Sequence, residues 1–237
     1  MRNPLGKILL LFLLIPALAL FVWHGFPLEQ PALAPALTGV TLVIDPGHGG
    51  ADAGVTGTNG APEDDINLAI SKKLAEYCRR AGAEVILTRE TEDALCEGKR
   101  SDLQARVEKA QAEEGDIFIS LHCNSYVGDS SQHGAQVFYE KGNTEGEQLA
   151  NILQNRLQQD LGNTERVALP HPSSYLLQHL SQPAVIVEMG FLTNAEEEAL
   201  LQQEEYQWQI ALSLYIGLWE YRNGTELTSE NGATEEN

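Results

Sequence analysis

Thr41-Leu-Val-Ile-Asp-Pro-Gly-His-Gly-Gly50 is the stretch from which the fold is predicted, because a short apolar run ends there abruptly around one histidine. The Pro46-Gly47 pair ends the strand, and the two glycines after His48 leave the backbone bare beside the imidazole. Ligands of α/β folds bind beyond the carboxyl ends of the strands, so the segment predicts an imidazole at that edge of a sheet. An ordinary strand-to-loop turn with an incidental histidine is the alternative for this segment alone.

Apolar strand-like runs alternate with helix-like segments through most of the chain. Strands are expected at 41–44, 84–88, 116–122, 134–139 and 184–188, and helices at 66–80, from 101 or 102 onward, at 145–161 and at 206–221. Several of these strands are apolar without alternation, which is typical of a parallel sheet covered on both faces. The sequence therefore predicts a single α/β domain in which helices cover both faces of a mostly parallel, twisted β-sheet.

The 237 residues divide into four stretches by composition. Within 1–23, Arg2 and Lys7 precede a run without charge, which is typical of either a signal peptide or a membrane anchor. Both alternatives predict that the remainder of the chain is exported. The other stretches are expected to be a proline-punctuated linker (24–38), the folded domain (39–222) and a disordered acidic tail (223–237).

Charge and cysteine usage exclude several kinds of site. The net charge of -19 argues against a partner with a phosphate backbone, which requires clustered lysine and arginine. Three cysteines are too few and too scattered for a disulfide framework or a cysteine-based zinc site, although Cys78 and Cys96 could pair. Cys123 follows His122 in a strand-like run, so it is expected to be buried on the opposite face of the strand.

Three strands end in, or lead into, a residue suited to metal binding or acid–base chemistry: His48, His122 and Glu188. If helical crossovers make the strands parallel, these residues share one edge of the sheet, and Glu63 adds a carboxylate just before a helix. Two histidines and one carboxylate suit zinc with an open position for water, while a further carboxylate such as Glu188 can transfer the proton. Individually, Glu63 could serve only the helix dipole, His122 could be a satisfied core histidine, and Glu188 could be an idle edge carboxylate.

Other polar residues near these positions are less informative. Asp45 and Asn124 flank expected ligands and could orient the imidazoles, or they could be ordinary turn and strand-end residues. His24, His133, His171 and His179 lie in linker, loop or helix contexts and receive no assigned role. The chain has no HExxH helix and no GxSxG turn, which argues against a zincin or a serine hydrolase.

The folded domain resembles the zinc-dependent N-acetylmuramoyl-L-alanine amidases of the type 3 group. The matching pieces occur in order and span the domain: Ile44–Gly50, Glu63–Leu68, Leu87–Arg89, Leu103–Arg106, Phe118–Asn124 and Val187–Asn194. The resemblance implies that His48, Glu63 and His122 bind Zn²⁺ and that Glu188 is the catalytic carboxylate. It also implies cleavage of the amide that joins N-acetylmuramic acid to the L-alanine of the peptidoglycan stem peptide.

Within this group the chain is most similar to the spore germination-specific amidases of endospore-forming bacteria. That similarity rests on the single N-terminal apolar segment and the absence of wall-binding repeats. It rests also on two stretches, Gly134–Tyr139 and Ser174–Gln178. It implies a role in forming muramic-δ-lactam in the spore cortex, with peptidoglycan as the substrate and an unidentified protein as a further possible partner. The membrane is a partner only if residues 1–23 remain attached. Two alternatives stay open, a zinc peptidase that cuts within stem peptides and a non-catalytic wall-binding domain.

Overall fold

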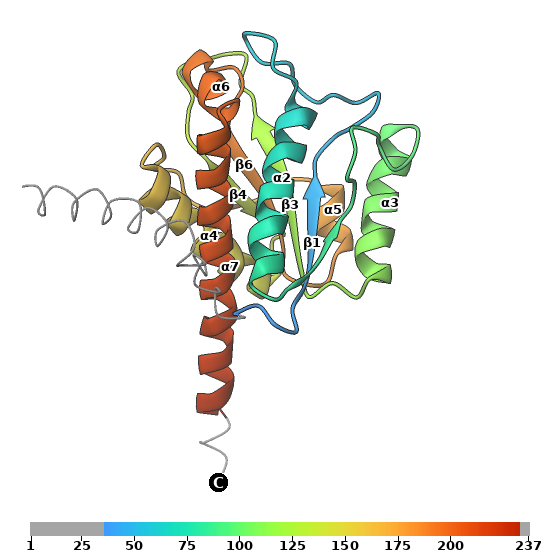
Figure 1. Ribbon diagram of the computed structural model, residues 1–237, viewed down its shortest axis with the longest axis vertical. Coiled ribbons are helices and arrows are strands. Elements are labelled where there is room, and N and C mark those ends of the chain that lie inside the picture. Colours follow the sequence, from blue (N-terminus) through green and yellow to red (C-terminus); the bar gives the residue numbers. More distant parts are fainter. Residues whose placement is uncertain (1–35, 233–237) are drawn as a thin grey trace, which may run out of the picture. The chain divides into compact units, whose positions relative to one another are not determined.

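The computed structural model describes residues 36–232, which fall in one compact unit built around a six-stranded sheet (Figure 1). The strand order is β2-β1-β3-β6-β4-β5. The strands are β1 (Thr41–Pro46), β2 (Glu84–Leu87), β3 (Ile117–Asn124), β4 (Gln136–Tyr139), β5 (Leu169–Pro170) and β6 (Ala184–Phe191). The predicted signal peptide or anchor and most of the predicted linker lie outside the described residues. None of the described helices combines the length and the apolar character that crossing a membrane requires.

The strands that carry the predicted site run parallel. β1 pairs in parallel with β2 and β3, and β3 pairs in parallel with β6. β4 runs antiparallel to β6, because the connection from β3 to β4 contains no helix and a parallel return would need a longer crossover. β5, which the sequence pattern does not reveal, pairs with β4 at the edge. The predicted mostly parallel sheet is confirmed, with β4 as its antiparallel member.

Helices cover both faces, as predicted. The helices are α2 (Glu63–Arg80), α3 (Lys99–Ala112), α4 (Thr144–Leu161), α5 (Tyr175–His179), α6 (Ala195–Leu201) and α7 (Glu204–Gly232). α7 packs against both α2 and α4, and these three helices cover one face, where α2 and α7 are visible side by side (Figure 1). α3 and α5 cover the other face through Val107, Leu176 and Leu177, which meet Phe118 and Ile186 of the sheet. The central strands β1, β3 and β6 therefore bury both of their faces, which explains their unbroken apolar runs.

Helix ends differ from the sequence expectation in three places. α2 begins at Glu63 after Pro62, three residues before the expected start at 66. α3 begins at Lys99 after Gly98, and Asp102 instead accepts hydrogen bonds from the backbone of Leu95 and Cys96. α7 runs to Gly232, so helical backbone continues into the stretch for which composition predicts a disordered tail. The domain boundaries themselves stay a prediction.

Candidate metal centre

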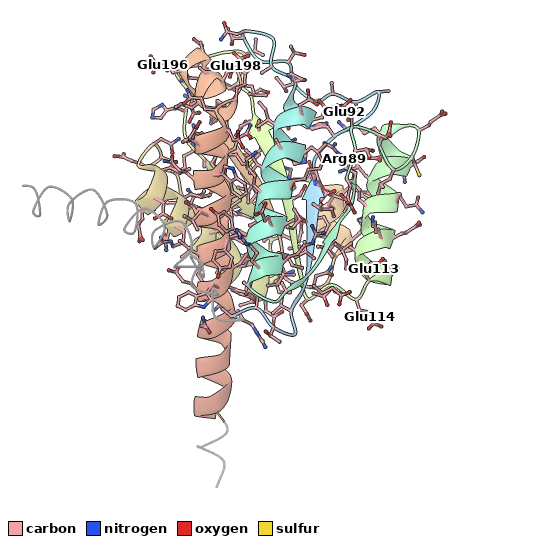
Figure 2. The ribbon with its side chains drawn as sticks, viewed as in Figure 1. Arg89, Glu92, Glu113, Glu114, Glu196 and Glu198 are labelled. Carbon is pink, nitrogen blue, oxygen red and sulfur yellow. The ribbon has the colours of Figure 1, made fainter. Side chains whose placement is uncertain are left out.

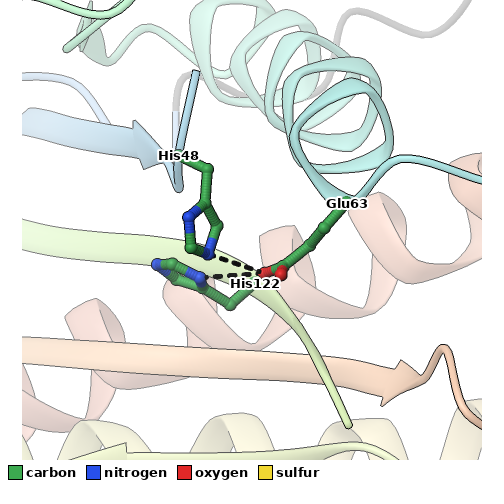
Figure 3. A group of neighbouring side chains, drawn as sticks. All are labelled: His48, Glu63 and His122. Carbon is green, nitrogen blue, oxygen red and sulfur yellow. Dashed lines mark hydrogen bonds and ion pairs between the residues drawn. The ribbon is translucent and has the colours of Figure 1, made fainter. Parts of the chain in front are cut away.

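His48, Glu63 and His122 come together at the carboxyl edge of the parallel strands (Figure 3). Glu63 Oε1 lies 3.2 Å from His48 Nε2 and 3.0 Å from His122 Nδ1. One ligand atom from each residue falls within 4.8 Å of the other two. Two imidazole nitrogens and a carboxylate oxygen thus come from three segments that are distant in sequence. These are the turn after β1, the first residue of α2 and the end of β3.

The backbone around His48 is shaped to bring its ring to this point. His48 has a φ of +61°, a left-handed conformation that costs a residue with a side chain about 1–2 kcal/mol. Gly47 is required beside it, because a Cβ at this position would clash with the ring of His122. Gly54 is required for the same reason, since its Cβ would meet the Glu63 carboxylate and the His48 ring. The glycines of the first sequence motif therefore allow the two imidazoles to approach.

Two buried arginines hold the turn that carries His48. Arg106 donates from Nη1 to Pro46 O at 2.7 Å and from Nη2 to His48 O at 2.5 Å. Arg89, which Figure 2 labels beside β1, donates from Nε to Pro46 O at 3.0 Å and from Nη2 to Gly47 O at 3.0 Å. Backbone carbonyls that point into a protein interior need such partners, and guanidinium groups supply several donors in a rigid plane. The two side chains thus fix the backbone of an unfavourable turn.

The Glu63 carboxylate is held from several sides. Its Oε2 accepts a hydrogen bond from Val55 N at 2.9 Å, and its Oε1 accepts one from Cys123 N at 3.1 Å. The loop before α2 is fixed by the buried Glu198 of α6, which accepts hydrogen bonds from Asn59 N and Ala61 N (Figure 2). These contacts leave little freedom for Glu63 to turn away from the histidines.

Asp52 contacts the ring nitrogen of His48 that faces away from Glu63. Its Oδ1 lies 3.2 Å from His48 Nδ1, so a proton on Nδ1 can be donated to Asp52 while the lone pair of Nε2 faces Glu63 and His122. Replacing Asp52 with asparagine should weaken the binding of a metal ion by this group about 10- to 100-fold, the usual effect of losing a partner that orients a metal ligand. Competition with a chromophoric chelator would measure this change. Asp160→Asn on α4 is the matched control, and equal zinc affinities of the two variants would contradict the role of Asp52.

Glu188 lies one strand away from His122. The two residues are register partners in the parallel pair β3–β6, so their Cα atoms are about 5 Å apart and their side chains share one face. The residue is partly exposed, yet its Oε2 is buried and has no hydrogen-bond partner among the described residues. Unpaired buried carboxylate oxygens are rare and call for an explanation.

The pKa values of Glu63 and Glu188 are shifted in opposite directions. Burial raises the pKa of Glu188 to about 7, and the negative charge of Glu63 adds to this, against the opposing effect of His122 and His48. Burial acts in the same direction on Glu63, but hydrogen bonds with His122 and His48 outweigh it and hold the pKa of Glu63 well below its usual range. Glu63 is thus an anion suited to a cation, and Glu188 is suited to proton transfer near neutral pH.

The donor set fits zinc. Two imidazole nitrogens and one carboxylate oxygen match catalytic zinc sites, in which a fourth position is left for water or substrate. Figure 3 shows the His48 and His122 rings converging on the same end of the Glu63 side chain. A carboxylate with a raised pKa beside such a site is the arrangement expected for hydrolysis of an amide or ester.

Several other sequence interpretations are settled by contacts. Asp45 does not touch an imidazole, because its buried carboxylate accepts hydrogen bonds from Thr88, Ser120 and Arg106. Asn124 also fails to reach either ring, since its side chain accepts from the backbone of Ser125. Cys123 is buried on the face opposite His122, as predicted. All three cysteines are free, so the possible pairing of Cys78 with Cys96 does not occur.

The residues that sequence reasoning missed are those that hold the site. Asp52 stands four residues after His48, but a single acidic residue in a glycine-rich loop carries no recognisable signal. Arg89 and Arg106 lie within matched motifs, and nothing in the sequence alone shows that both reach the turn after β1. Among the remaining histidines that the structure describes, none belongs to the metal group.

Comparison with known proteins agrees with this geometry. The sequence model of the family described as N-acetylmuramoyl-L-alanine amidase matches residues 42–220. The germination-specific N-acetylmuramoyl-L-alanine amidase of Bacillus subtilis (strain 168) is 36% identical over 193 residues, which cover 78% of this chain and 81% of that protein. The amidase LytC of the same organism is 32% identical over 187 residues, which cover 78% of this chain and 36% of LytC.

Solved structures of amidases are also similar to this chain. The CwlD amidase from Clostridioides difficile, solved in complex with the GerS lipoprotein, has a TM-score of 0.73 and is 35% identical, covering 77% of this chain and 98% of that chain. The catalytic domain of CwlV, an N-acetylmuramoyl-L-alanine amidase from Bacillus (Paenibacillus) polymyxa, has a TM-score of 0.70 and is 30% identical. It covers 78% of this chain and 98% of the CwlV chain.

Proposed function

Because this chain belongs to the N-acetylmuramoyl-L-alanine amidase family, we propose that it hydrolyses the amide between N-acetylmuramic acid and L-alanine with zinc held by His48, Glu63 and His122. The amidase activity on the cell wall follows from the family. The identity of the metal rests on one observation, the convergence of two imidazole nitrogens and a carboxylate oxygen within 4.8 Å.

Each residue has a distinct part in the proposed reaction. Bound zinc would supply a Lewis acid that lowers the pKa of water and polarises the scissile carbonyl. Glu188 takes the proton of the attacking water, because its pKa of about 7 makes it a sufficiently strong base near neutral pH. The same carboxyl group then donates the proton to the departing amine of L-alanine, so that the leaving group departs neutral. Asp52, Arg89 and Arg106 keep His48 in place throughout.

The pH dependence of the reaction follows from Glu188. A base works only when deprotonated, so kcat/KM should rise about tenfold per pH unit on the acid side and level off above the apparent pKa. Burial raises the pKa of Glu188 from 4.5 to about 7 in the metal-free site, and a nearby cation lowers it again. The pH at which kcat/KM levels off should therefore lie between 4.5 and about 7. A rate profile from pH 4 to 9 on soluble muropeptides measures this pH. A flat profile across that interval would contradict the assignment of Glu188.

Product analysis tests the proposed activity. The purified domain, residues 39–237, is incubated with zinc and peptidoglycan, and the released molecules are identified by mass spectrometry. Stem peptides that begin with L-alanine, released with zinc and not with a chelator, would support the amidase. Fragments cut within the stem peptide would favour a peptidase, and wall binding without release would favour a non-catalytic domain. Zinc content measured in the same sample separates a loaded but inactive protein from a misassigned metal site.

The proposal extends to the spore cortex. The similarity to the germination-specific amidase of Bacillus subtilis supports removal of stem peptides before muramic-δ-lactam forms. Export through residues 1–23 to the outer face of the membrane, the cell wall or the cortex space would bring the enzyme to this substrate. Expression of the chain in B. subtilis spores that lack their own germination-specific amidase should restore muramic-δ-lactam. Lactam-free cortex despite production of the exported protein would contradict this role.

A protein partner is part of the proposal as well. The similar CwlD amidase was solved in complex with the GerS lipoprotein, which supports an exported lipoprotein as the kind of partner that this chain binds. Affinity capture of the tagged chain from sporulating cells, followed by mass spectrometry, identifies such a partner. Recovery of the chain alone would contradict this part of the proposal and leave the amidase activity unaffected.

A further inference from the structure

A cavity of about 1240 Å³ lies beside the carboxyl end of β6. Three segments line most of it: 130–133 before β4, 162–166 after α4, and 193–197 at the start of α6. Among the described residues that line this cavity, Arg166 is the one arginine or lysine. The proposed mechanism gives this cavity no role.

The guanidinium group of Arg166 is held in a fixed position. It donates from Nε to His133 O at 2.9 Å, from Nη2 to Gln132 Oε1 at 2.7 Å and from Nη1 to Gln136 Oε1 at 3.3 Å. Its Cζ lies 4.6 Å from the centre of the Phe191 ring, within the range of a cation–π contact. A guanidinium has five N–H donors, so these three hydrogen bonds leave two available for a ligand.

Among the described residues, Arg166 forms no salt bridge, although its charge acts on the nearby Glu197 carboxylate. The salt bridges of the described part of the chain do not include it, although acidic residues outnumber lysine and arginine 34 to 15 in the whole sequence. The nearby carboxylate of Glu197 is directed instead at the backbone N–H groups of Gly134 and Phe191. An oriented, partly exposed guanidinium that forms no internal salt bridge is suited to a carboxylate from outside the chain.

This cation lies close to the proposed catalytic carboxylate. Gln136, which accepts from Arg166, is the register partner of Glu188 in the antiparallel pair β4–β6. Register partners share one face of a sheet with Cα atoms about 5 Å apart, so Arg166 lies on the order of 10 Å from Glu188. An extended peptide spans about 3.3 Å per residue, and this separation therefore corresponds to about two or three residues from the scissile bond.

We propose, resting on the amidase function above, that Arg166 binds the free α-carboxylate of the second stem-peptide residue and so selects D-glutamate over D-isoglutamine at that position. The carboxylate must come from the peptide, since the lactyl carboxyl of the sugar is consumed in the bond that is cut. Glu165, Glu196 and Glu197 also line the cavity, and their charges restrict favourable carboxylate binding to the immediate surroundings of the guanidinium.

A competition assay tests this selectivity. The full chain, loaded with zinc, is given an equimolar mixture of two disaccharide-tetrapeptide muropeptides that differ only in whether the second residue carries a free or an amidated α-carboxyl group. The ratio of the released peptides gives the ratio of kcat/KM. The wild-type chain should prefer the free acid about 10- to 100-fold, the size expected for a charge-assisted hydrogen bond. Arg166→Gln should lose this preference through a higher KM for the muropeptide with the free carboxyl group. Its kcat/KM for the amidated muropeptide should stay within about threefold of wild type.

Two further variants separate recognition from folding. Arg166→Lys should keep a reduced preference for the acid, because lysine retains the charge and lacks the planar pair of donors. Arg156→Gln on α4, which pairs with Asp160 and Glu220, is the matched control and should keep the full preference. Equal cleavage of both substrates by the wild-type chain, or an equal loss on both in Arg166→Gln, would overturn the proposal and leave the amidase function standing. Cleavage of neither substrate by the zinc-loaded wild-type chain would overturn both.

Discussion

Replacing Glu188 with alanine should lower kcat about 10²- to 10⁴-fold while the chain keeps its zinc, because the residue supplies proton transfer and no ligand. Its buried Oε2 has no partner among the described residues, and burial raises its pKa to about 7, so the folded protein holds this carboxyl in a state that favours proton exchange. Removing it should not weaken the fold, since an unpaired buried polar group costs stability. Steady-state rates on soluble muropeptides, together with zinc content, measure both parts of the prediction.

Matched variants make this result specific to Glu188. Glu188→Gln keeps the size of the side chain and removes the base, so it should be as inactive as the alanine variant. Glu108→Ala on α3, where the exposed carboxylate accepts a hydrogen bond from Gln104, should have wild-type kcat and zinc content. Near-normal turnover in Glu188→Ala would contradict the catalytic assignment, and loss of zinc in the same variant would make Glu188 a ligand instead.

Replacing His122 with alanine should remove both zinc and turnover. Loss of a group that only orients a ligand weakens metal binding about 10- to 100-fold, so loss of a ligand should exceed 100-fold. Here the effect is compounded, because His122 Nδ1 lies 3.0 Å from Glu63 Oε1 and the remaining two groups would face an open space. Zinc affinity by chelator competition and rates at saturating zinc provide the test.

A second histidine provides the control for His122. His179→Ala removes an imidazole that stacks on Tyr175 in α5, outside the metal group, and should leave zinc affinity and turnover unchanged. Wild-type zinc affinity in His122→Ala would show that the metal, if any, is bound elsewhere. The contrast with Glu188→Ala is informative, because one variant should lose zinc and the other should keep it.

The sequence was sufficient to predict that these side chains lie at one edge of the sheet, for a simple geometric reason. His48, His122 and Glu188 each follow an unbroken apolar run, and parallel strands bring such positions to one edge. Glu63 could be added because it precedes a helix in a proline-marked turn. Contacts that are local along a strand or set by strand direction can thus be inferred from pattern alone.

The groups that hold the site could not be predicted in this way. Arg106 reaches the turn after β1 from a helix about sixty residues later, and no periodicity of the sequence encodes that contact. The sequence left open whether Asp45 orients an imidazole or is an ordinary turn residue, and the full burial of its carboxylate favours partners that can neutralise it and donate hydrogen bonds. Long-range polar contacts of this kind depend on the packed structure.

Element boundaries were missed for a different reason. Both α2 and α3 begin earlier than the sequence pattern suggests, because Pro62 and Gly98 stand at their N-caps and offer no side-chain cap that could mark the start. The short α5 and α6 lie below the length at which hydrophobic periodicity is informative. β4 was correctly predicted as a strand, but its direction depends on the absence of a helix in the preceding connection.

The most direct test of the central claim is a zinc titration of the metal-free chain, followed by the release of L-alanine-terminated stem peptides from peptidoglycan. The account predicts no release without metal and a rise that saturates at one zinc per chain, with the same stoichiometry in Glu188→Ala but no release. Full release from protein shown to be free of metal would contradict the assignment of His48, Glu63 and His122 as a catalytic zinc site.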